Sequence, residues 1–265
     1  IEPLRCGMGA FAHRDGVDAR DNSLNNMRNH PLEMVETNSS VLVLEYDVSP
    51  DSGGPGKFRG GVGQTMTIQA LRDDGVIVGR GMERLRFQGF GVAGGKPGTV
   101  LKAIFNRGKP GARELSKIHE LKLQKGDTLT FLMPGGGGYG DPFEREPEAV
   151  LRDVQNGFVT PAGAERDYGV VIRDDAVDAA ATERLRRGKV SGTNQQFDFG
   201  PDRAAWDAVF DDATMTRLNA LLMRLGVAAR SQRRRELFER VIPALTQVPV
   251  PSLEIAVGDV AAARG

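Results

Sequence analysis

The side chains that could do chemistry are concentrated in a glycine-rich stretch, residues 51–63. It reads DSGGPGKFRGGVG and places a lysine and an arginine among its glycines. Glycines let backbone N–H groups point into a common space, where two nearby cations would help to hold a phosphate or carboxylate. The residues predicted to contact such an anion are Gly53, Gly54, Arg59, Gly60 and Gly61. The alternative is a structural turn between strands, because the stretch matches neither the P-loop nor the dinucleotide-binding fingerprint.

A second glycine run, residues 135–142, has the order expected of a loop that cradles a ligand. The run GGGGYGDP follows an expected strand and precedes an expected helix, as ligand-binding glycine loops do. Four consecutive glycines are costly to order unless a close approach requires them. The residues predicted for that approach are Gly136, Gly137 and Gly138. Because the run contains no basic residue, tight packing of the strand against the helix explains it equally well.

A polar segment nearer the start supplies amide, imidazole and carboxylate groups that could line a cleft. The residues predicted for this polar lining are Asn26, Asn29, His30 and Glu33. The other two histidines are His13 and His119, and none of the three has the His-Glu-x-x-His spacing of a helical zinc site. We therefore assign no metal ligands in this chain. Hydrogen bonding within loops is the alternative role for the segment.

The remaining reactive side chains form no self-contained catalytic centre. Cys6 is the single cysteine, which excludes an internal disulfide, and no Cys-x-x-Cys pair marks a reactive thiolate. No Gly-x-Ser-x-Gly elbow is present, so a hydrolase triad finds no support. The arginine-rich run at residues 230–235 could bind an acidic partner or form a solvated helix face.

Composition narrows the classes of partner. The chain of 265 residues carries 35 basic and 35 acidic side chains, a formal net charge of zero that favours neither nucleic acid nor an anionic membrane surface. No run approaches the roughly 18 apolar residues of a membrane-spanning helix. We expect a cytoplasmic protein. The sequence starts at Ile1 without a methionine or a signal peptide, so we expect a cleaved, split or trimmed chain.

The elements that must position these residues change in character along the chain. The 34 glycines are clustered in the first half and predict many tight turns there. Between them, short segments alternate apolar with polar residues, which is typical of half-buried antiparallel strands. These segments are residues 41–47, 66–70, 84–87, 100–104 and 128–132. We therefore expect residues 1–142 to form a mainly antiparallel β body, as a sandwich or a barrel.

Helical patterns follow this body. Apolar spacing predicts a helix over residues 146–156 that stops at Gly157, and Thr160 with Pro161 begins another. We expect residues 143–187 to form a short helix and strand region. Residues 188–200 read as a linker that opens a helical tail, 188–265, in which Asp212 is a possible helix cap. The predicted fold class is α+β.

Both glycine stretches, in this order, resemble those of the hydantoinase B/5-oxoprolinase family. Residues 168–171, YGVV, and the upstream stretches 15–18, DGVD, and 26–36, NMRNHPLEMVE, are also similar to that family, as is FDFGP at residues 197–201. The resemblance covers nearly the whole chain. The family's metal-binding segments, rich in histidine and aspartate, are not matched, so the chain resembles only the C-terminal portion of a B-type subunit.

This resemblance implies a two-component enzyme. An A-type subunit with an actin-like or sugar-kinase-like fold would use ATP and Mg²⁺ to phosphorylate the carbonyl oxygen of a cyclic amide or ketone, and the B-type subunit would complete the reaction. Such activation is physically reasonable because a resonance-stabilised amide is a poor electrophile. The expected partners are the A-type ATPase, the N-terminal portion of the B-type subunit with a divalent metal, and a small cyclic amide or ketone.

Three functions follow from this resemblance. The leading expectation is a subunit of an ATP-dependent ring-opening amidohydrolase that acts on a hydantoin, 5-oxoproline or a related lactam. The nearest alternative is a subunit of an ATP-dependent ketone carboxylase of the acetone or acetophenone type, and the third is a non-catalytic scaffold. In each case we expect a chain that is inactive alone.

Overall fold

The computed structural model describes residues 4–21, 27–187 and 196–241, and the chain divides into two compact units. The first unit ends at Gly200 and the second begins at Pro201. We expected a boundary at residue 188, but strand β11 (Phe197–Asp198) pairs with β4 (Gly91–Val92) and belongs to the first unit. Residues 143–187 also belong to the first unit rather than standing apart.

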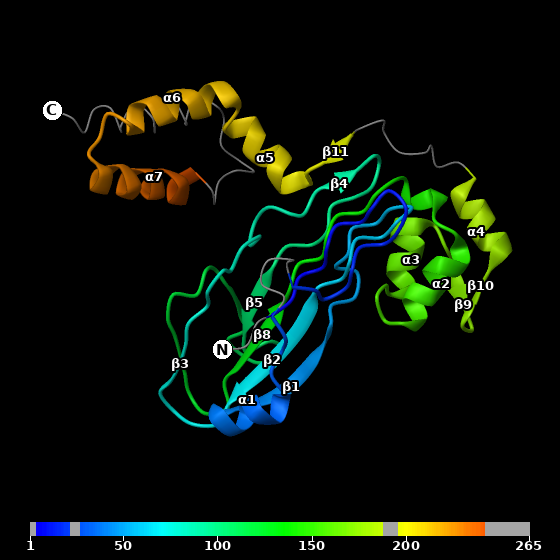
Figure 1. Cartoon of the computed structure of the whole chain (residues 1–265), viewed down its shortest axis with the longest axis horizontal. Coiled ribbons are helices and arrows are strands. Elements are labelled where there is room, and N and C mark those ends of the chain that lie inside the picture. Colours follow the sequence, from blue (N-terminus) through cyan, green and yellow to red (C-terminus); the bar gives the residue numbers. More distant parts are fainter. Residues whose placement is uncertain (1–3, 22–26, 188–195, 242–265) are drawn as a thin grey trace. The chain divides into compact units, whose positions relative to one another are not determined.

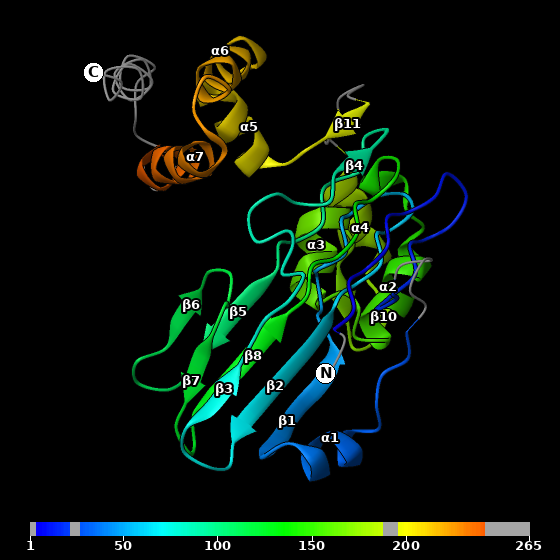
Figure 2. The same ribbon diagram turned by 60° about the vertical axis from the view of Figure 1, so that its left-hand side comes forward.

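One antiparallel sheet dominates the first unit, with the strand order β1-β2-β8-β5-β6. Figures 1 and 2 show this sheet together with the helices of the same unit, which follow it in the chain. Its strands are β1 (Val41–Val48), β2 (Gln64–Ala70), β5 (Lys102–Phe105), β6 (Arg113–Leu115) and β8 (Thr128–Leu132). Four of the expected strands are therefore confirmed, together with the α+β class.

Alternation along the strands gives the sheet one apolar face. Met66 lies opposite Phe131 and Ile68 opposite Leu129, and this face joins a hydrophobic core. The buried members of that core are Met82, Leu101, Ala103, Ile118, Leu129 and Met133.

Two expectations for the β body are wrong. Within the described residues the body is not a sandwich or barrel, because beside the five-stranded sheet it forms two-stranded sheets and no second large one. Residues 84–87 do not form a strand either: Arg84 has a φ of 58°, a left-handed conformation that interrupts an extended chain.

Two backbone N–H groups on the free edge of β1 are occupied by nearby carboxylates. The backbone N–H of Val43 donates to the carboxylate of Glu36, at 2.7 Å, and that of Val48 donates to Asp47, also at 2.7 Å. Glu36 lies in α1 (Leu32–Asn38), the helix that precedes the strand. Three further small sheet pairings involve β3 (Gly75–Ile77) with β7 (Leu121–Leu123), β9 (Ile172–Arg173) with β10 (Ala176–Val177), and β4 with β11.

Beyond the sheet, the chain forms what we call the glycine bundle, made of residues 7–10, 14–19, 52–63, 89–98 and 134–140. These segments run side by side between the sheet and the helices (Figure 1) and are joined by backbone hydrogen bonds. A Cβ atom at Gly136 would lie 1.9 Å from the carbonyl oxygen of Met8, and one at Gly60 would lie 2.0 Å from that of Gly136. Glycine is required here because backbone packs directly against backbone.

Three helices cover one end of the glycine bundle. They are α2 (Pro147–Gln155), α3 (Pro161–Tyr168) and α4 (Ala179–Arg186), preceded by the short helix η1 (Pro142–Glu144). The expected helix over 146–156 is confirmed as α2. Thr160 caps α3 by accepting a hydrogen bond from the N–H of Gly163, as its sequence position predicts. These helices share a small core of Val150, Val159, Ala164, Tyr168 and Val170.

The second unit is helical over residues 201–241, as expected, and residues 188–195 and 242–265 of the expected tail lie outside the described residues. Its helices are α5 (Pro201–Val209), α6 (Asp212–Leu222) and α7 (Val227–Val241), and Asp211 rather than Asp212 caps α6. Arg230 donates to the carbonyl oxygens of Leu222 and Leu225 and so completes the end of α6. The buried core consists of Val209, Phe210, Leu218, Leu222 and Leu237. Within the residues described, no helix combines the length and apolar character needed to cross a membrane.

Candidate functional site

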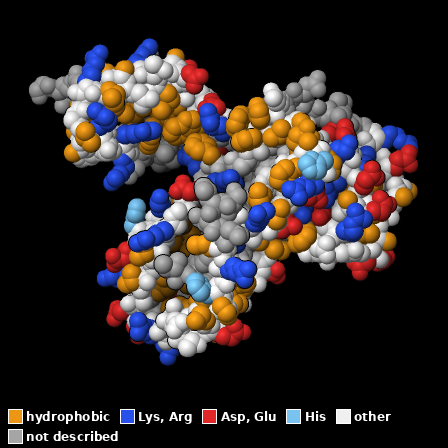
Figure 3. All heavy atoms as spheres, in the orientation of Figure 1, with side chains coloured by type: hydrophobic (Ala, Val, Ile, Leu, Met, Phe, Trp, Pro, Cys, Tyr) orange, Lys and Arg blue, Asp and Glu red, His pale blue; other side chains and the backbone are white. Residues whose placement is uncertain are grey.

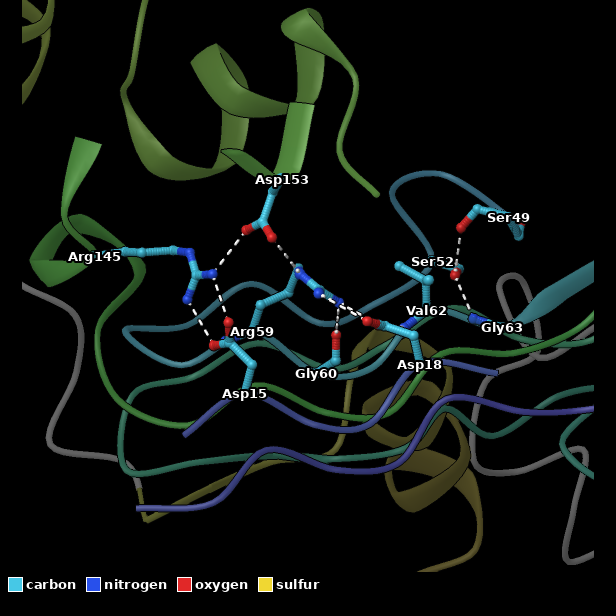
Figure 4. A network of polar contacts seen from close by, with 10 residues as sticks. All are labelled: Asp15, Asp18, Ser49, Ser52, Arg59, Gly60, Val62, Gly63, Arg145 and Asp153. Carbon is cyan, nitrogen blue, oxygen red and sulfur yellow. Dashed lines mark hydrogen bonds and ion pairs between the residues drawn. The ribbon is translucent and has the colours of Figure 1, made fainter. Parts of the chain in front are cut away.

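Five charged side chains meet where the glycine bundle contacts α2, and we call them the arginine–aspartate network (Figure 4). Arg145 binds both oxygens of Asp15, at 2.7 Å each, and also Asp153, at 2.7 Å. Arg59 binds Asp18 at 2.8 Å, and its Nε lies 3.3 Å from the other oxygen of Asp153. Asp153 is therefore shared by both arginines and joins α2 to the bundle.

Backbone groups of the glycine bundle fix the carboxylates in place. Asp15 accepts a hydrogen bond from the N–H of Arg59, at 2.7 Å, and Asp18 accepts one from Val62, at 2.8 Å. Arg145 donates to the carbonyl oxygen of Lys57, at 3.0 Å. The network is thus built onto the same backbone that the glycines bring together, and both arginine side chains are at most 5% exposed.

Burial and pairing compete in setting the protonation of the network. Burial raises the pKa of Asp153, and the charges of Arg59 and Arg145 oppose this rise without overcoming it. Burial also acts to raise the pKa of Asp15, but the hydrogen bonds and charge of Arg145 outweigh it and hold that pKa below its usual value. Two guanidinium groups thus face three carboxyl groups, and of Asp15 and Asp153 it is Asp153 that holds a proton more readily.

Three buried polar atoms of this region have no hydrogen-bond partner within the described residues. They are Nε of Arg59, Nε of Arg145 and the hydroxyl of Tyr168. Burial raises the pKa of Tyr168, so its hydroxyl stays protonated as a donor. Buried donors are normally satisfied. Nε of Arg59 still forms an ion pair with Asp153, at 3.3 Å, whereas Nε of Arg145 and the hydroxyl of Tyr168 are buried without a hydrogen-bond partner among the described residues.

A pocket of about 530 Å³ lies beside the network, and Asp15, Arg145 and Asp153 are among its lining residues. The other lining residues are Arg14, Lys57, Phe58, Glu144, Glu146, Ala149, Arg152 and Asn156. Figure 3 shows basic and acidic side chains side by side in the region of α2 and α3. Both signs of charge are therefore presented in one cavity, which suits a ligand that carries both. No group of three or more His, Cys, Asp or Glu suited to a metal occurs in the described part of the chain.

The glycines predicted to bind an anion are placed in the interior of the glycine bundle. The N–H groups of Gly54, Gly60, Gly61, Gly136 and Gly138 all donate to backbone carbonyl oxygens. A Cβ at Gly53 would lie 2.1 Å from the carbonyl oxygen of Gly60, and one at Gly137 would lie 1.7 Å from that of Phe90. The close approach predicted for the second run thus occurs against other backbone segments. Five of the seven predicted glycines thus already use their N–H groups within the backbone, which favours the structural alternative for both stretches.

The predicted side chains do not converge on one cleft. Arg59 enters the arginine–aspartate network, whereas Asn29 accepts a hydrogen bond from Nε of Arg5, at 2.9 Å. His30 and Glu33 are exposed, and Glu33 lies in the first turn of α1. Asn26 lies outside the described residues. His119 is exposed as well.

Sequence reasoning missed Arg145 and Asp153, which complete the network. A signal for Asp153 was available, because it lies on α2 three residues after Val150 and directly before Val154, on the apolar side of the helix. A carboxylate there is buried and needs a partner. Arg145 had no comparable signal, since it lies in a polar connection between η1 and α2.

Comparison with known proteins finds a family match over the first half of the chain. The model of the family described as Hydantoinase B/oxoprolinase matches residues 1–142. These residues include the glycine stretches, β1 to β8 and two of the network's aspartates, whereas Arg145 and Asp153 lie beyond the match.

Two individual relatives and one solved structure are also similar to this chain. Caprolactamase subunit beta of Pseudomonas jessenii is 37% identical over 160 residues, which cover 58% of this chain and 27% of that protein. The acetone carboxylase alpha subunit of Xanthobacter autotrophicus is 27% identical over 231 residues, 70% of this chain and 29% of that protein. The crystal structure of the ATP-dependent caprolactamase from P. jessenii has a TM-score of 0.57 at 31% identity, over 69% of this chain and 33% of that chain. The chain thus spans less than a third of the length of these two curated relatives.

Proposed function

This chain belongs to the hydantoinase B/oxoprolinase family, and on that premise we propose that it forms part of an ATP-dependent ring-opening amidohydrolase. The substrate would be a hydantoin, 5-oxoproline or a related lactam. The observation that carries this proposal is the likeness to caprolactamase, which is 37% identical in its beta subunit and 31% identical in its structural alignment. The carboxylase relative is less similar, at 27%.

The proposed reaction needs groups beyond those of this chain. Hydrolysis adds water to the amide carbonyl carbon and breaks the C–N bond, and amide resonance makes that carbon a poor electrophile. Phosphorylation of the carbonyl oxygen by ATP would remove the resonance and supply a better leaving group. We assign ATP and Mg²⁺ to an A-type ATPase subunit and a divalent metal to the part of a B-type subunit that this chain does not match.

The surface of the first unit supports assembly with other polypeptides. Phe90, Phe197 and Phe199 are 40–47% exposed and lie with ring centroids 5.4–6.0 Å apart. Figure 3 shows hydrophobic side chains gathered over β4 and β11, the elements that carry this group. Adjacent exposed aromatic rings are typical of protein–protein contact surfaces.

A ketone carboxylase is the second candidate, and one observation favours it. The acetone carboxylase subunit aligns over 70% of this chain, more than the 58% aligned with caprolactamase subunit beta. The carboxylase thus matches this chain over at least as much of its length as caprolactamase, whose structure aligns over 69% of the chain. A carboxylase would form a new C–C bond with bicarbonate, so the two reactions differ in their co-substrate.

The proposal is tested by isolating the chain with the proteins that bind it. We expect a tagged chain to copurify with an ATPase subunit, and the assembly to release an amino acid from a lactam only when ATP is present. Parallel reactions with a ketone and labelled bicarbonate test the alternative, because only a carboxylase fixes the label into an acid-stable product. Lactam hydrolysis by the chain alone without ATP, or label fixation without lactam hydrolysis, contradicts the amidohydrolase.

A further inference from the structure

The turn that ends α2 places a reactive side chain next to an unhindered backbone nitrogen. An asparagine or aspartate followed by glycine can close a succinimide ring on the next backbone nitrogen, because glycine has no Cβ to obstruct the attack. The chain contains three such pairs, which are Asp15–Gly16, Asp74–Gly75 and Asn156–Gly157. Only Asn156 carries an amide, which is a better electrophile than the carboxylate that an aspartate bears at neutral pH.

The structure protects the first of these pairs and leaves the asparagine accessible. Both oxygens of Asp15 are bound by Arg145, at 2.7 Å each, and the backbone N–H that would attack Asp15 donates to the carbonyl oxygen of Arg59, at 2.8 Å. Asn156 and Gly157, in contrast, are both exposed, and the side-chain amide of Asn156 forms no hydrogen bond within the described residues. The amide carbon of Asn156 is therefore open to attack.

We propose that Asn156 is a site of spontaneous deamidation. The backbone nitrogen of Gly157 attacks Cγ of Asn156, the bond from Cγ to the side-chain nitrogen breaks, and this nitrogen leaves as ammonia with the proton of the attacking N–H. Water then opens the ring: attack at Cγ restores the main chain and gives aspartate, whereas attack at the backbone carbonyl carbon gives isoaspartate. The reaction consumes only water, so it takes place whether or not the proposed function is correct.

The local structure at the end of α2 sets the rate of this reaction. Asn156 follows the last residue of the helix, with φ −83° and ψ −1°, and Gly157 has a φ of 73°. The N–H of Gly157 donates to the carbonyl oxygen of Val154, at 3.0 Å, and this bond must open before the nitrogen can attack. Helix ends open locally at low cost. Loss of this one hydrogen bond should slow the reaction about tenfold relative to an unfolded peptide.

The isoaspartate product would disturb the attachment of α2 to the glycine bundle. It lengthens the main chain by a carbon atom at residue 156, whereas the segment that follows is held at fixed points. The N–H groups of Phe158 and Val159 donate to the backbone carbonyl oxygen of Asp153, at 2.8 and 3.3 Å, and the carbonyl oxygen of Phe158 accepts from Asp51, at 3.0 Å. The side chain of Asp153 contacts both arginines of the network. A change in an exposed turn thus reaches the buried network.

Peptide mapping of the purified full chain tests this site. The chain is kept for several days at mildly alkaline pH, where the attacking nitrogen loses its proton more readily, and samples are digested with trypsin. Cleavage after Arg152 and Arg166 releases residues 153–166, DVQNGFVTPAGAER, in which Asn156 is the only asparagine. We expect this peptide to gain the mass of one deamidation and to separate into aspartate and isoaspartate forms. The gain should be about tenfold slower than in the same synthetic peptide.

Two controls separate this site from general ageing of the chain. The side-chain oxygen of Asn106 accepts from the N–H of Thr128 and its nitrogen donates to Asp127, so Asn106 should stay unmodified in the same samples. Hydrogen exchange of α2 should become faster in the aged wild-type chain and not in the aged Asn156→Gln variant. Modification of Asn156 no faster than that of Asn106 overturns the site, and unchanged exchange in a fully modified sample overturns its effect on α2.

Discussion

The glycine bundle and the helical second unit stabilise their structures by opposite means. In the bundle, main chains touch directly, and a Cβ at Gly136 would lie 1.9 Å from a backbone oxygen. In the helical unit, side chains fill the interior: Leu218 is fully buried, and the rings of Trp206 and Phe210 lie 4.4 Å apart. The bundle depends on the absence of side chains, and the helical unit depends on their bulk.

This difference determines which substitutions each region tolerates. A backbone contact cannot relax by changing a rotamer, so one added methyl group must move a whole segment. A side-chain core loses energy in proportion to the atoms removed, and its neighbours can shift to fill part of the space. The bundle should thus respond to added volume, and the helical unit to lost volume.

The largest effect is expected from Gly136→Ala. The new methyl group would overlap the backbone of Met8, so we expect the first unit to fail to fold, seen as loss of soluble protein and of the cooperative unfolding transition. The matched control is Gly9→Ala in the same bundle, where the nearest atom would lie 3.9 Å away. If both variants fold equally well, the bundle is not packed backbone against backbone.

A smaller loss is expected when the arginine–aspartate network is opened. Arg145→Ala leaves Asp15 and Asp153 without their shared cation, and breaking a buried ion pair costs about 4 kcal/mol. Urea unfolding monitored by circular dichroism measures this change in the free energy of unfolding. Lys57→Ala breaks an exposed pair, 48% and 55% exposed on its two side chains, and serves as the control with little effect. Equal losses from both variants would mean that the network does not fasten α2 to the bundle.

The helical unit should respond to truncation. Leu218→Ala removes a fully buried side chain and should lower the stability of the second unit by about 3 kcal/mol. Hydrogen exchange should show faster opening of α6 and α7 while the sheet strands keep their protection. Met223→Ala, at a side chain 66% exposed, is the control. Faster exchange throughout both units would contradict their separate cores.

The weakest effect is a pH dependence within the network. The folded-state pKa of Asp15 is lowered, so its contribution to stability is fully present above its unfolded pKa, near 4, and is lost as the pH falls through its lower folded pKa. In the Asp15→Asn variant, the free energy of unfolding should therefore fall less steeply as the pH is lowered. Urea unfolding between about pH 3 and pH 6 measures this change. An unchanged slope would show that Asp15 is not held ionised by Arg145.

Sequence patterns were sufficient where periodicity and capping decide the structure. The apolar face of β2 and β8 follows from simple alternation, and α2 follows from Pro147, the spacing of Val150 and Val154, and the stop at Gly157. Thr160 identified the start of α3 for the same local reason. These features depend on neighbours within a few residues.

The glycine bundle could not be derived in this way. Its segments are far apart in sequence, and a glycine that contacts another main chain has the same local signature as one that turns or faces a ligand. Arg59 looked like an anion-binding side chain because its partners, Asp18 and Asp153, are 41 and 94 positions away. Only the three-dimensional pairing shows which carboxylates neutralise it.

The capped edge of β1 restricts how another protein can join this molecule. The N–H groups of Val43 and Val48 are occupied by the carboxylates of Glu36 and Asp47, so an incoming strand meets acceptors where it needs donors. Extension of the sheet from one molecule to the next is blocked at these points. At this edge of the sheet, a companion would have to recognise shape and side chains rather than add a strand.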